Sequence, residues 1–158
     1  MRYQDQVVKT TYKSLDDVCR AAQAVAADKL DWNPGGEARS ILNQMQEIAM
    51  AGSWFLPLIR DGKVPEFDRH AIREARRLRE QFDTLDKCID AARSSTSELC
   101  QAIAEFPDSE LEREMHVPFG GGQTMTMADI LAIPSWNMIY HLGQINYVQL
   151  MLGDKEMH

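Results

Sequence analysis

Three polar side chains lie at helical spacing in an otherwise apolar segment near the end of the 158-residue chain. His141 lies between Met138 and Ile145, with Asn137 one turn before it and Gln144 nearly one turn after it. An imidazole in such an apolar stripe is costly to bury without a polar partner. We therefore expect His141 to form a hydrogen bond or to bind a metal ion.

A second polar pair, Gln44 and Glu47, occupies one end of a helical stripe that continues through the apolar residues Ala51 and Trp54. If this stripe faces the helix of His141, a carboxylate and an imidazole meet inside the protein. Spacing alone favours a hydrogen-bonded structural pair, formed by His141 with Glu47 or with Gln44. The alternative is a metal site, although one carboxylate and one histidine fall short of the three firm ligands typical of zinc.

Other patterns that could carry chemistry are weaker. Cys19, Cys88 and Cys100 match no zinc or redox spacing, and their odd number argues against a disulfide framework. The glycine run Gly120–Gly122 lacks the Lys-Ser/Thr pair of a phosphate-binding loop, so we interpret it as a turn.

The chain is acidic, with 24 Asp and Glu residues against 17 Lys and Arg residues and a formal net charge of −7. Such a charge repels a phosphate backbone, and the densest basic run, residues 69–80, alternates in sign as a solvated helix face does. We therefore expect no nucleic-acid partner. The N-terminus has no apolar segment of the signal-peptide type and no apolar run approaches membrane-spanning length, so we expect a cytoplasmic protein without membrane contact.

Helical periodicity predicts the elements that would position these residues. It covers four segments, and it continues without loss of phase through the serines at 94–97, which favours one long third helix. The predicted helices span about 5–29, 39–60, 71–106 and 126–152. Helical periodicity stops in residues 112–126, where two short runs flank three glycines, and this pattern predicts an extended crossover or a weak hairpin. Four amphipathic helices must bury four stripes, so residues 1–158 are predicted to form a single all-α domain, an up-down four-helix bundle with an irregular or short β-like crossover before the last helix.

Three short segments resemble the DinB/YfiT-like superfamily in order and spacing. They are Leu30–Pro34 (LDWNP), Glu37–Leu42 (EARSIL) and Tyr140–Ile145 (YHLGQI), of which the last is the most specific. The resemblance extends over nearly the whole chain. It implies an up-down four-helix bundle, commonly dimeric, among enzymes that include thiol-dependent transferases and isomerases.

The resemblance also implies a divalent metal, often nickel or zinc, held by three histidines. The last of these positions corresponds to His141, the position four residues earlier to Asn137, and the position on the second helix to Glu47, with Gln44 as the less favoured register. One histidine of three is therefore present, and Glu and Asn replace the other two. Gln44 and Gln144 are neighbours of this altered triad.

Two hypotheses follow for the function. In the first, the protein is a metal-dependent enzyme in which Glu47, Asn137 and His141 hold an ion that activates a thiol or water for reaction with a small-molecule substrate. In the second, the protein is a degenerate, metal-free bundle that binds a small molecule or only forms a homodimer, and Glu47 and His141 are a buried hydrogen-bonded pair.

Overall fold

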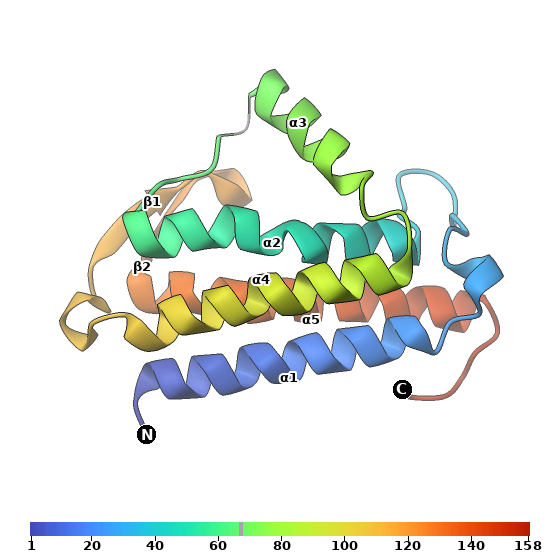
Figure 1. Cartoon of the computed structure of the whole chain (residues 1–158), viewed down its shortest axis with the longest axis horizontal. Coiled ribbons are helices and arrows are strands. Elements are labelled where there is room, and N and C mark those ends of the chain that lie inside the picture. The colour runs from blue at the N-terminus through green and yellow to red at the C-terminus, as the bar shows by residue number, and fades with distance from the viewer. Residues whose placement is uncertain (67) are drawn as a thin grey trace.

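Four long helices lie side by side and form a bundle (Figure 1). The computed structural model describes residues 1–66 and 68–158. The bundle helices are α1 (Tyr3–Gln23), α2 (Ile41–Asp61), α4 (Leu85–Glu105) and α5 (Met127–Met151). The prediction of an all-α four-helix bundle is confirmed. None of the helices in the described ranges is long and apolar enough to cross a membrane.

The bundle helices do not simply alternate in direction along the chain. In Figure 1, α1 and α5 run one way, whereas α2 and α4 run the opposite way. Long-range hydrogen bonds agree with this: Tyr3 near the start of α1 bonds the carbonyl of Ala128 near the start of α5, and Gln149 near the end of α5 bonds the carbonyl of Ala21. A parallel α2–α4 pair needs a connection that carries the chain back along the bundle.

That connection contains a separate helix, α3 (Arg69–Arg79), so the prediction of one continuous helix over 71–106 is wrong. Two side-chain caps define the break: Asp68 accepts the backbone N–H of Ala71, and Thr84 accepts that of Lys87. A capped N-terminus begins a new helix in a new direction. No residue of α3 is buried and the helix projects from the bundle (Figure 1), which agrees with a solvated face over 69–80.

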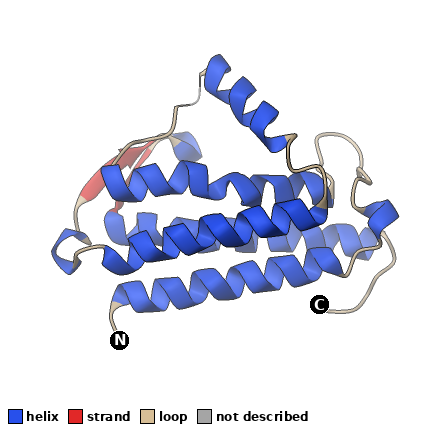
Figure 2. Ribbon diagram, viewed as in Figure 1, coloured by secondary structure: helices blue, strands red, loops and turns tan. Residues whose placement is uncertain are grey.

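Other boundaries differ less from expectation. The first helix ends at Gln23, and the predicted extension to residue 29 is a short 3-10 helix, Ala27–Lys29. Helix α4 runs without interruption through the serines at 94–97. The predicted crossover is a β-hairpin of β1 (Glu114–Val117) and β2 (Gln123–Thr126), paired antiparallel (Figure 2). Its turn contains Gly120–Gly122, which all have positive φ.

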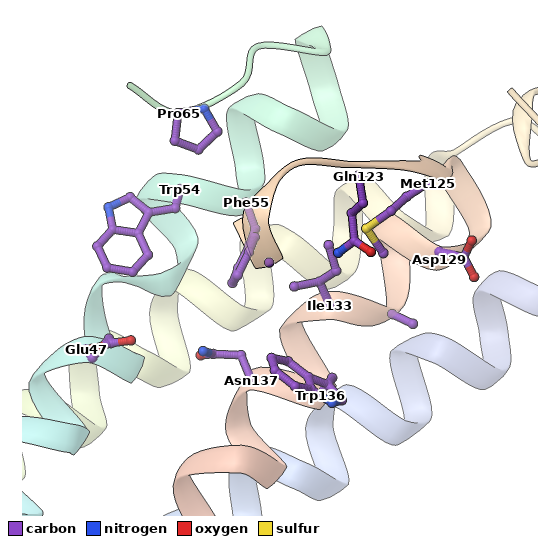
Figure 3. Close-up of a pocket in the computed structure, with 12 residues that line it drawn as sticks. Glu47, Trp54, Phe55, Pro65, Gln123, Met125, Asp129, Ile133, Trp136 and Asn137 are labelled. Atoms are coloured by element: carbon purple, nitrogen blue, oxygen red, sulfur yellow. The ribbon is translucent and has the colours of Figure 1, made fainter. Parts of the chain in front are cut away.

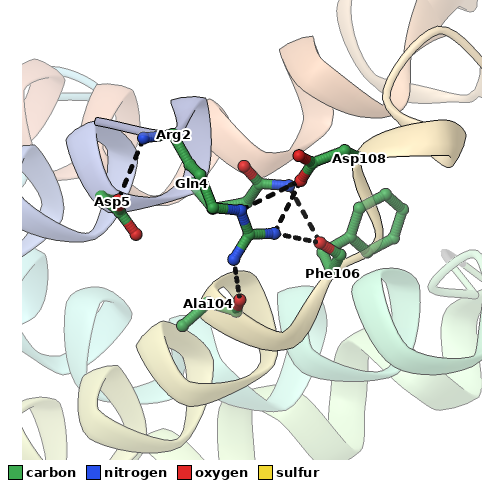
Figure 4. A network of polar contacts seen from close by, with 6 residues as sticks. All are labelled: Arg2, Gln4, Asp5, Ala104, Phe106 and Asp108. Atoms are coloured by element: carbon green, nitrogen blue, oxygen red, sulfur yellow. Dashed lines mark hydrogen bonds and ion pairs between the residues drawn. The ribbon is translucent and has the colours of Figure 1, made fainter.

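The N-terminus is fixed to the end of α4 by a polar network (Figure 4). The guanidinium of Arg2 donates to the carbonyls of Ala104 and Phe106 and pairs with Asp108 at 2.7 Å. The last turn of α4 has no basic residue of its own, so Arg2 supplies the cation that its carbonyl end favours. Buried Gln4 adds a second donor to Phe106 and Asp108.

The bundle interior is mainly apolar, and the polar side chains buried in it include His141 and Gln44. The largest fully buried side chains come from α2, α4 and α5: Ile41, Met45, Ile48, Leu58, Leu99, Ile103, Met127, Ile130, Leu131, Met138, His141 and Ile145. The stripe around His141 therefore faces the core, whereas in the second stripe Gln44 and Ala51 are buried and Glu47 and Trp54 are half-buried. Cys19, Cys88 and Cys100 are buried free thiols.

Candidate functional site

His141 lies inside the bundle with a side-chain exposure of 0%. Its Nδ1 is 3.2 Å from Oε1 of Gln44, one helix away on α2. An amide oxygen can only accept a hydrogen bond, so Nδ1 carries a proton and donates it. This bond fixes both the ring orientation and the tautomer: in the neutral ring, the lone pair is on Nε2.

The second ring nitrogen faces a carboxylate. Nε2 of His141 lies 3.3 Å from Oε1 of Glu47. The two atoms are not aligned for a hydrogen bond, and among the residues that the structure describes the buried Nε2 has no hydrogen-bond partner. When the His141 ring is neutral, Nε2 and Oε1 of Glu47 are both hydrogen-bond acceptors and they face one another. The contact is favourable only when a proton or a metal cation lies between the two atoms.

Glu47 is held on its other side by arginine. Its Oε2 lies 2.5 Å from Nη2 of Arg39 and 4.0 Å from Nη1 of Arg79, the last residue of α3. Burial by itself raises the pKa of Glu47, but the contacts with His141 and Arg39 outweigh it and hold this pKa at about 2. Glu47 is therefore a carboxylate at any physiological pH. Arg39 is positioned in turn by Asn43, whose side-chain oxygen accepts from its Nε at 2.7 Å.

A pocket of about 560 Å³ opens beside this pair between α2, α5 and the hairpin. Figure 3 shows Glu47 and Asn137 pointing toward one another from α2 and α5 at one end of it. The wall is mostly apolar and aromatic: Trp54, Phe55, Pro65, Met125, Ile133 and Trp136. A second pocket of about 520 Å³, between α2 and α3, also reaches Glu47 and includes Arg79.

The structure brings the predicted residues together closely. The sequence predicted Glu47 or Gln44 as the partner of His141. Both residues contact its ring, Gln44 at Nδ1 and Glu47 at Nε2. Asn137 shares the pocket with Glu47. Gln144 is half-buried, and the described residues give it no hydrogen bond to the pair.

Sequence reasoning missed the two arginines. Arg39, Asn43 and Glu47 follow one another at intervals of four, which is the spacing of one helix face, and this spacing could have indicated the Arg39–Glu47 pair although Arg39 lies just before the start of α2. Arg79 lies in a segment interpreted only as a solvated face, and nothing in the sequence places it near Glu47. Its proximity results from the path of α3.

The imidazole nitrogen of His141 and the carboxylate of Glu47 are atoms that can bind a divalent cation, but they supply only two strong ligands. Two ligands of a tetrahedral ion with bonds of about 2.0–2.1 Å lie roughly 3.3–3.4 Å apart, and Nε2 and Oε1 are separated by 3.3 Å. The bonds from Gln44 to the ring and from Arg39 to the carboxylate resemble the outer contacts that orient metal ligands. However, no group of three or more His, Cys, Asp or Glu suited to a metal exists within the described residues, so a third ligand would be the amide of Asn137.

Residues 10–145 match the family model of the DinB superfamily, and the chain belongs to that family. A comparison with curated proteins finds no significant match.

Solved structures of low identity share the fold. YfiT from Bacillus subtilis, described as a probable metal-dependent hydrolase with an unusual four-helix bundle topology, is 12% identical with a TM-score of 0.74 over 95% of this chain and 87% of YfiT. The colibactin self-resistance protein ClbS, solved with double-stranded DNA, is 13% identical with a TM-score of 0.67 over 93% of this chain and 95% of ClbS. A mycothiol-dependent maleylpyruvate isomerase is 14% identical with a TM-score of 0.65, and the match covers 90% of this chain and 60% of the isomerase.

Proposed function

We propose that this protein is a metal-dependent enzyme that acts on a small molecule bound in the pocket between α2 and α5. The observation that carries the proposal is the buried Nε2 of His141, which finds no hydrogen-bond partner within residues 1–66 and 68–158 and faces the Glu47 carboxylate at 3.3 Å. The ion would be held by His141, Glu47 and the amide oxygen of Asn137. When bound, a divalent ion lowers the pKa of a water or a thiol and so supplies a nucleophile at neutral pH.

The surrounding residues prepare these donors. Gln44 keeps the ring proton on Nδ1, which leaves the Nε2 lone pair directed toward Glu47. Arg39 holds Oε2 of Glu47 and leaves Oε1 on the side of the ring. One imidazole, one carboxylate and one amide oxygen form a chemically harder ligand set than three histidines do. The metal preference of the site therefore shifts from nickel or zinc toward manganese.

The pocket wall defines the kind of substrate. Trp54, Phe55 and Ile133 give the pocket an apolar and aromatic wall beside Glu47. A substrate with an apolar or aromatic body would fill the wall and place a polar reacting group at Glu47 and Asn137. We propose transfer or isomerisation with a thiol co-substrate as the reaction class, in line with the thiol-dependent isomerase of the same fold.

A second function is supported by the arginines. The guanidinium of Arg39 at 2.5 Å and that of Arg79 at 4.0 Å compensate the charge of Glu47 and oppose the approach of a cation. In this alternative, Nε2 of His141 is protonated and pairs with Glu47, and the chain is a metal-free bundle that binds a small molecule without catalysis.

Metal content distinguishes the two. Protein without a tag or chelator is incubated with manganese, nickel or zinc, passed over a desalting column and measured by mass spectrometry of the elements. About one equivalent of metal in the wild type, lost in the Glu47→Ala/His141→Ala double variant and kept in His70→Ala, supports the enzyme. His70 is an exposed histidine on α3 and controls for surface binding. Wild-type protein with no metal under all three conditions overturns the enzyme proposal and leaves the metal-free one.

A further inference from the structure

Helix α3 projects from the bundle although one of its sides is apolar (Figure 1). The helix has 11 residues, none of which is buried, and its largest apolar side chains, Ile72 and Leu78, are 51% and 41% exposed. A helix shorter than about 12–15 residues is marginal in water by itself, and packing of its apolar side normally stabilises it. An apolar body placed between α3 and α2 would supply that packing.

The second pocket, of about 520 Å³, lies between these two helices. The apolar side chains of its walls include Met50, Trp54 and Pro57 on α2 and Ile72, Ala75 and Leu78 on α3. Glu47 and Pro57 both line the pocket and are ten positions apart on α2, which gives the pocket a length of roughly 15 Å. A pocket of this volume can hold a small organic ligand, and its length suits an elongated apolar chain.

One end of the second pocket holds a guanidinium that is available for an anion. Arg79 is the last residue of α3, lines the pocket and has a side chain that is only 26% exposed. Its ion pair within the described residues is the one with Glu47, at 4.0 Å, which is beyond hydrogen-bond distance. A guanidinium has five N–H donors in a fork that fits a carboxylate with two parallel hydrogen bonds. Arg79 can therefore bind the carboxylate of a ligand in the pocket.

The other charged residues of the second pocket leave this role to Arg79. Glu47 is compensated by Arg39 at 2.5 Å. Glu74 is compensated by Arg77 at 3.4 Å. Two more charged residues line the pocket, both are exposed to solvent, and they have opposite signs: Lys63 and Glu66.

We propose that the second pocket is a binding site for an amphipathic carboxylate of the fatty-acid type. The carboxylate pairs with Arg79, and the apolar chain lies between α2 and α3 and covers Ile72 and Leu78. The site goes beyond the proposed reaction and does not depend on it, because neither a metal ion nor His141 takes part in the binding. The two pockets share Trp54 in their walls, so a ligand in the second pocket also contacts one wall of the first.

Ligands with the same apolar chain and different head groups test the site. Decanoate, decanol and decyltrimethylammonium are each titrated calorimetrically into the wild-type protein below their micellar concentrations. EDTA is present, so that a metal ion at Glu47 and His141 cannot bind the carboxylate. Decanoate should bind at one site and at least about 10-fold more tightly than decanol, because a hydrogen bond to a charged group is worth roughly that factor or more. Decyltrimethylammonium should bind least. No binding of decanoate, or equal binding of all three, overturns the proposal.

Variants of α3 place the carboxylate. Arg79→Gln should reduce the affinity for decanoate to that for decanol and leave the affinity for decanol unchanged. Arg76→Gln is the matched control, an exposed arginine on the same helix that does not line the pocket, and should bind decanoate as the wild type does. Binding that survives Arg79→Gln but is lost in Met125→Glu, a change in the wall of the first pocket, overturns the proposal.

Hydrogen exchange tests the position of the apolar chain without any substitution. The backbone amides of α3 should exchange more slowly when decanoate is bound, because the ligand fills the space between α3 and α2. Unchanged exchange in α3 at saturating decanoate contradicts the proposed site. If circular dichroism shows Arg79→Gln to be unfolded, the exchange of the wild type decides alone. The metal content of the protein is measured separately, so failure of this proposal leaves the proposed function as it stands.

Discussion

A close approach of α2 and α4 at Gly52 and Ser95 offers a quantitative test of the packing. A Cβ added to Gly52 would lie 2.4 Å from Cβ of Ser95 and 3.3 Å from its Cα, whereas real Cβ contacts essentially never fall below 3.0 Å. Replacing a helical glycine by alanine normally gains about 1 kcal/mol. Forcing two helices apart costs about 1–3 kcal/mol, and α2 and α4 share the most extensive helix pairing of the bundle. We expect Gly52→Ala to lower the free energy of unfolding by about 2 kcal/mol, which is the upper cost of about 3 kcal/mol less the gain of about 1 kcal/mol, because the added Cβ would meet the Cβ and Cα of Ser95 and not the end of a flexible side chain.

Urea unfolding followed by circular dichroism measures this change, and the Tm should fall by roughly 4–8 °C for a chain of this length. Ser95→Gly removes the Cβ that Gly52→Ala would strike, so the double variant is the control. We expect the alanine to cost less in that background, with a coupling of at least about 1 kcal/mol. An alanine that stabilises the wild type, or one that costs the same with and without Ser95, would refute the proposed close approach.

Three further predictions concern charge, capping and thiols. Because the pKa of Glu47 is held at about 2, below its ordinary 4.5, its carboxylate should stabilise the fold by up to about 3 kcal/mol above pH ~4.5 and progressively less as the pH falls toward 2. The difference in unfolding free energy between wild type and Glu47→Gln should shrink over that window, and a difference that stays constant from about pH 6 to about pH 2.5 would contradict this. Thr126 and Asp129 form a capping box at the start of α5, so Thr126→Ala should cost about 1 kcal/mol in urea unfolding, and an unchanged midpoint would argue against the cap. Burial raises the pKa of Cys88 to about 12 and that of Cys100 to about 11, so neither thiol should react with a thiol reagent near pH 8 until the protein unfolds, and rapid reaction of the folded chain would show that they are accessible.

The pairing of Glu47 with His141 could be anticipated because both residues interrupt apolar stripes. Burying a polar side chain requires a polar partner. Two polar residues in one small core can pair only if their helices face one another, and α2 and α5 do. The hairpin was also predictable, because its two short runs flank three glycines that can adopt positive φ.

The break between α3 and α4 was not predictable from periodicity. Ala71, Ala75 and Leu78 continue the phase of the later core residues, yet no residue of α3 is buried. Periodicity reports which residues share a helix face and does not report whether the face has a neighbour. Thr84, which caps the start of α4, was the one local indication of a helix start there. Only the path of the chain shows that a new helix begins at this residue.

The sequence by itself determined the helical stripes, the interior place of His141, Gln44 and Glu47, and membership of the DinB superfamily, because apolar period and local capping are encoded in neighbouring residues. Only the tertiary structure decided that α2 and α4 run parallel, that Arg39 and Arg79 meet Glu47, and that α3 borders a pocket on α2. These features join residues far apart in the chain. They depend on how α3 carries the backbone across the bundle, and no local preference specifies that path.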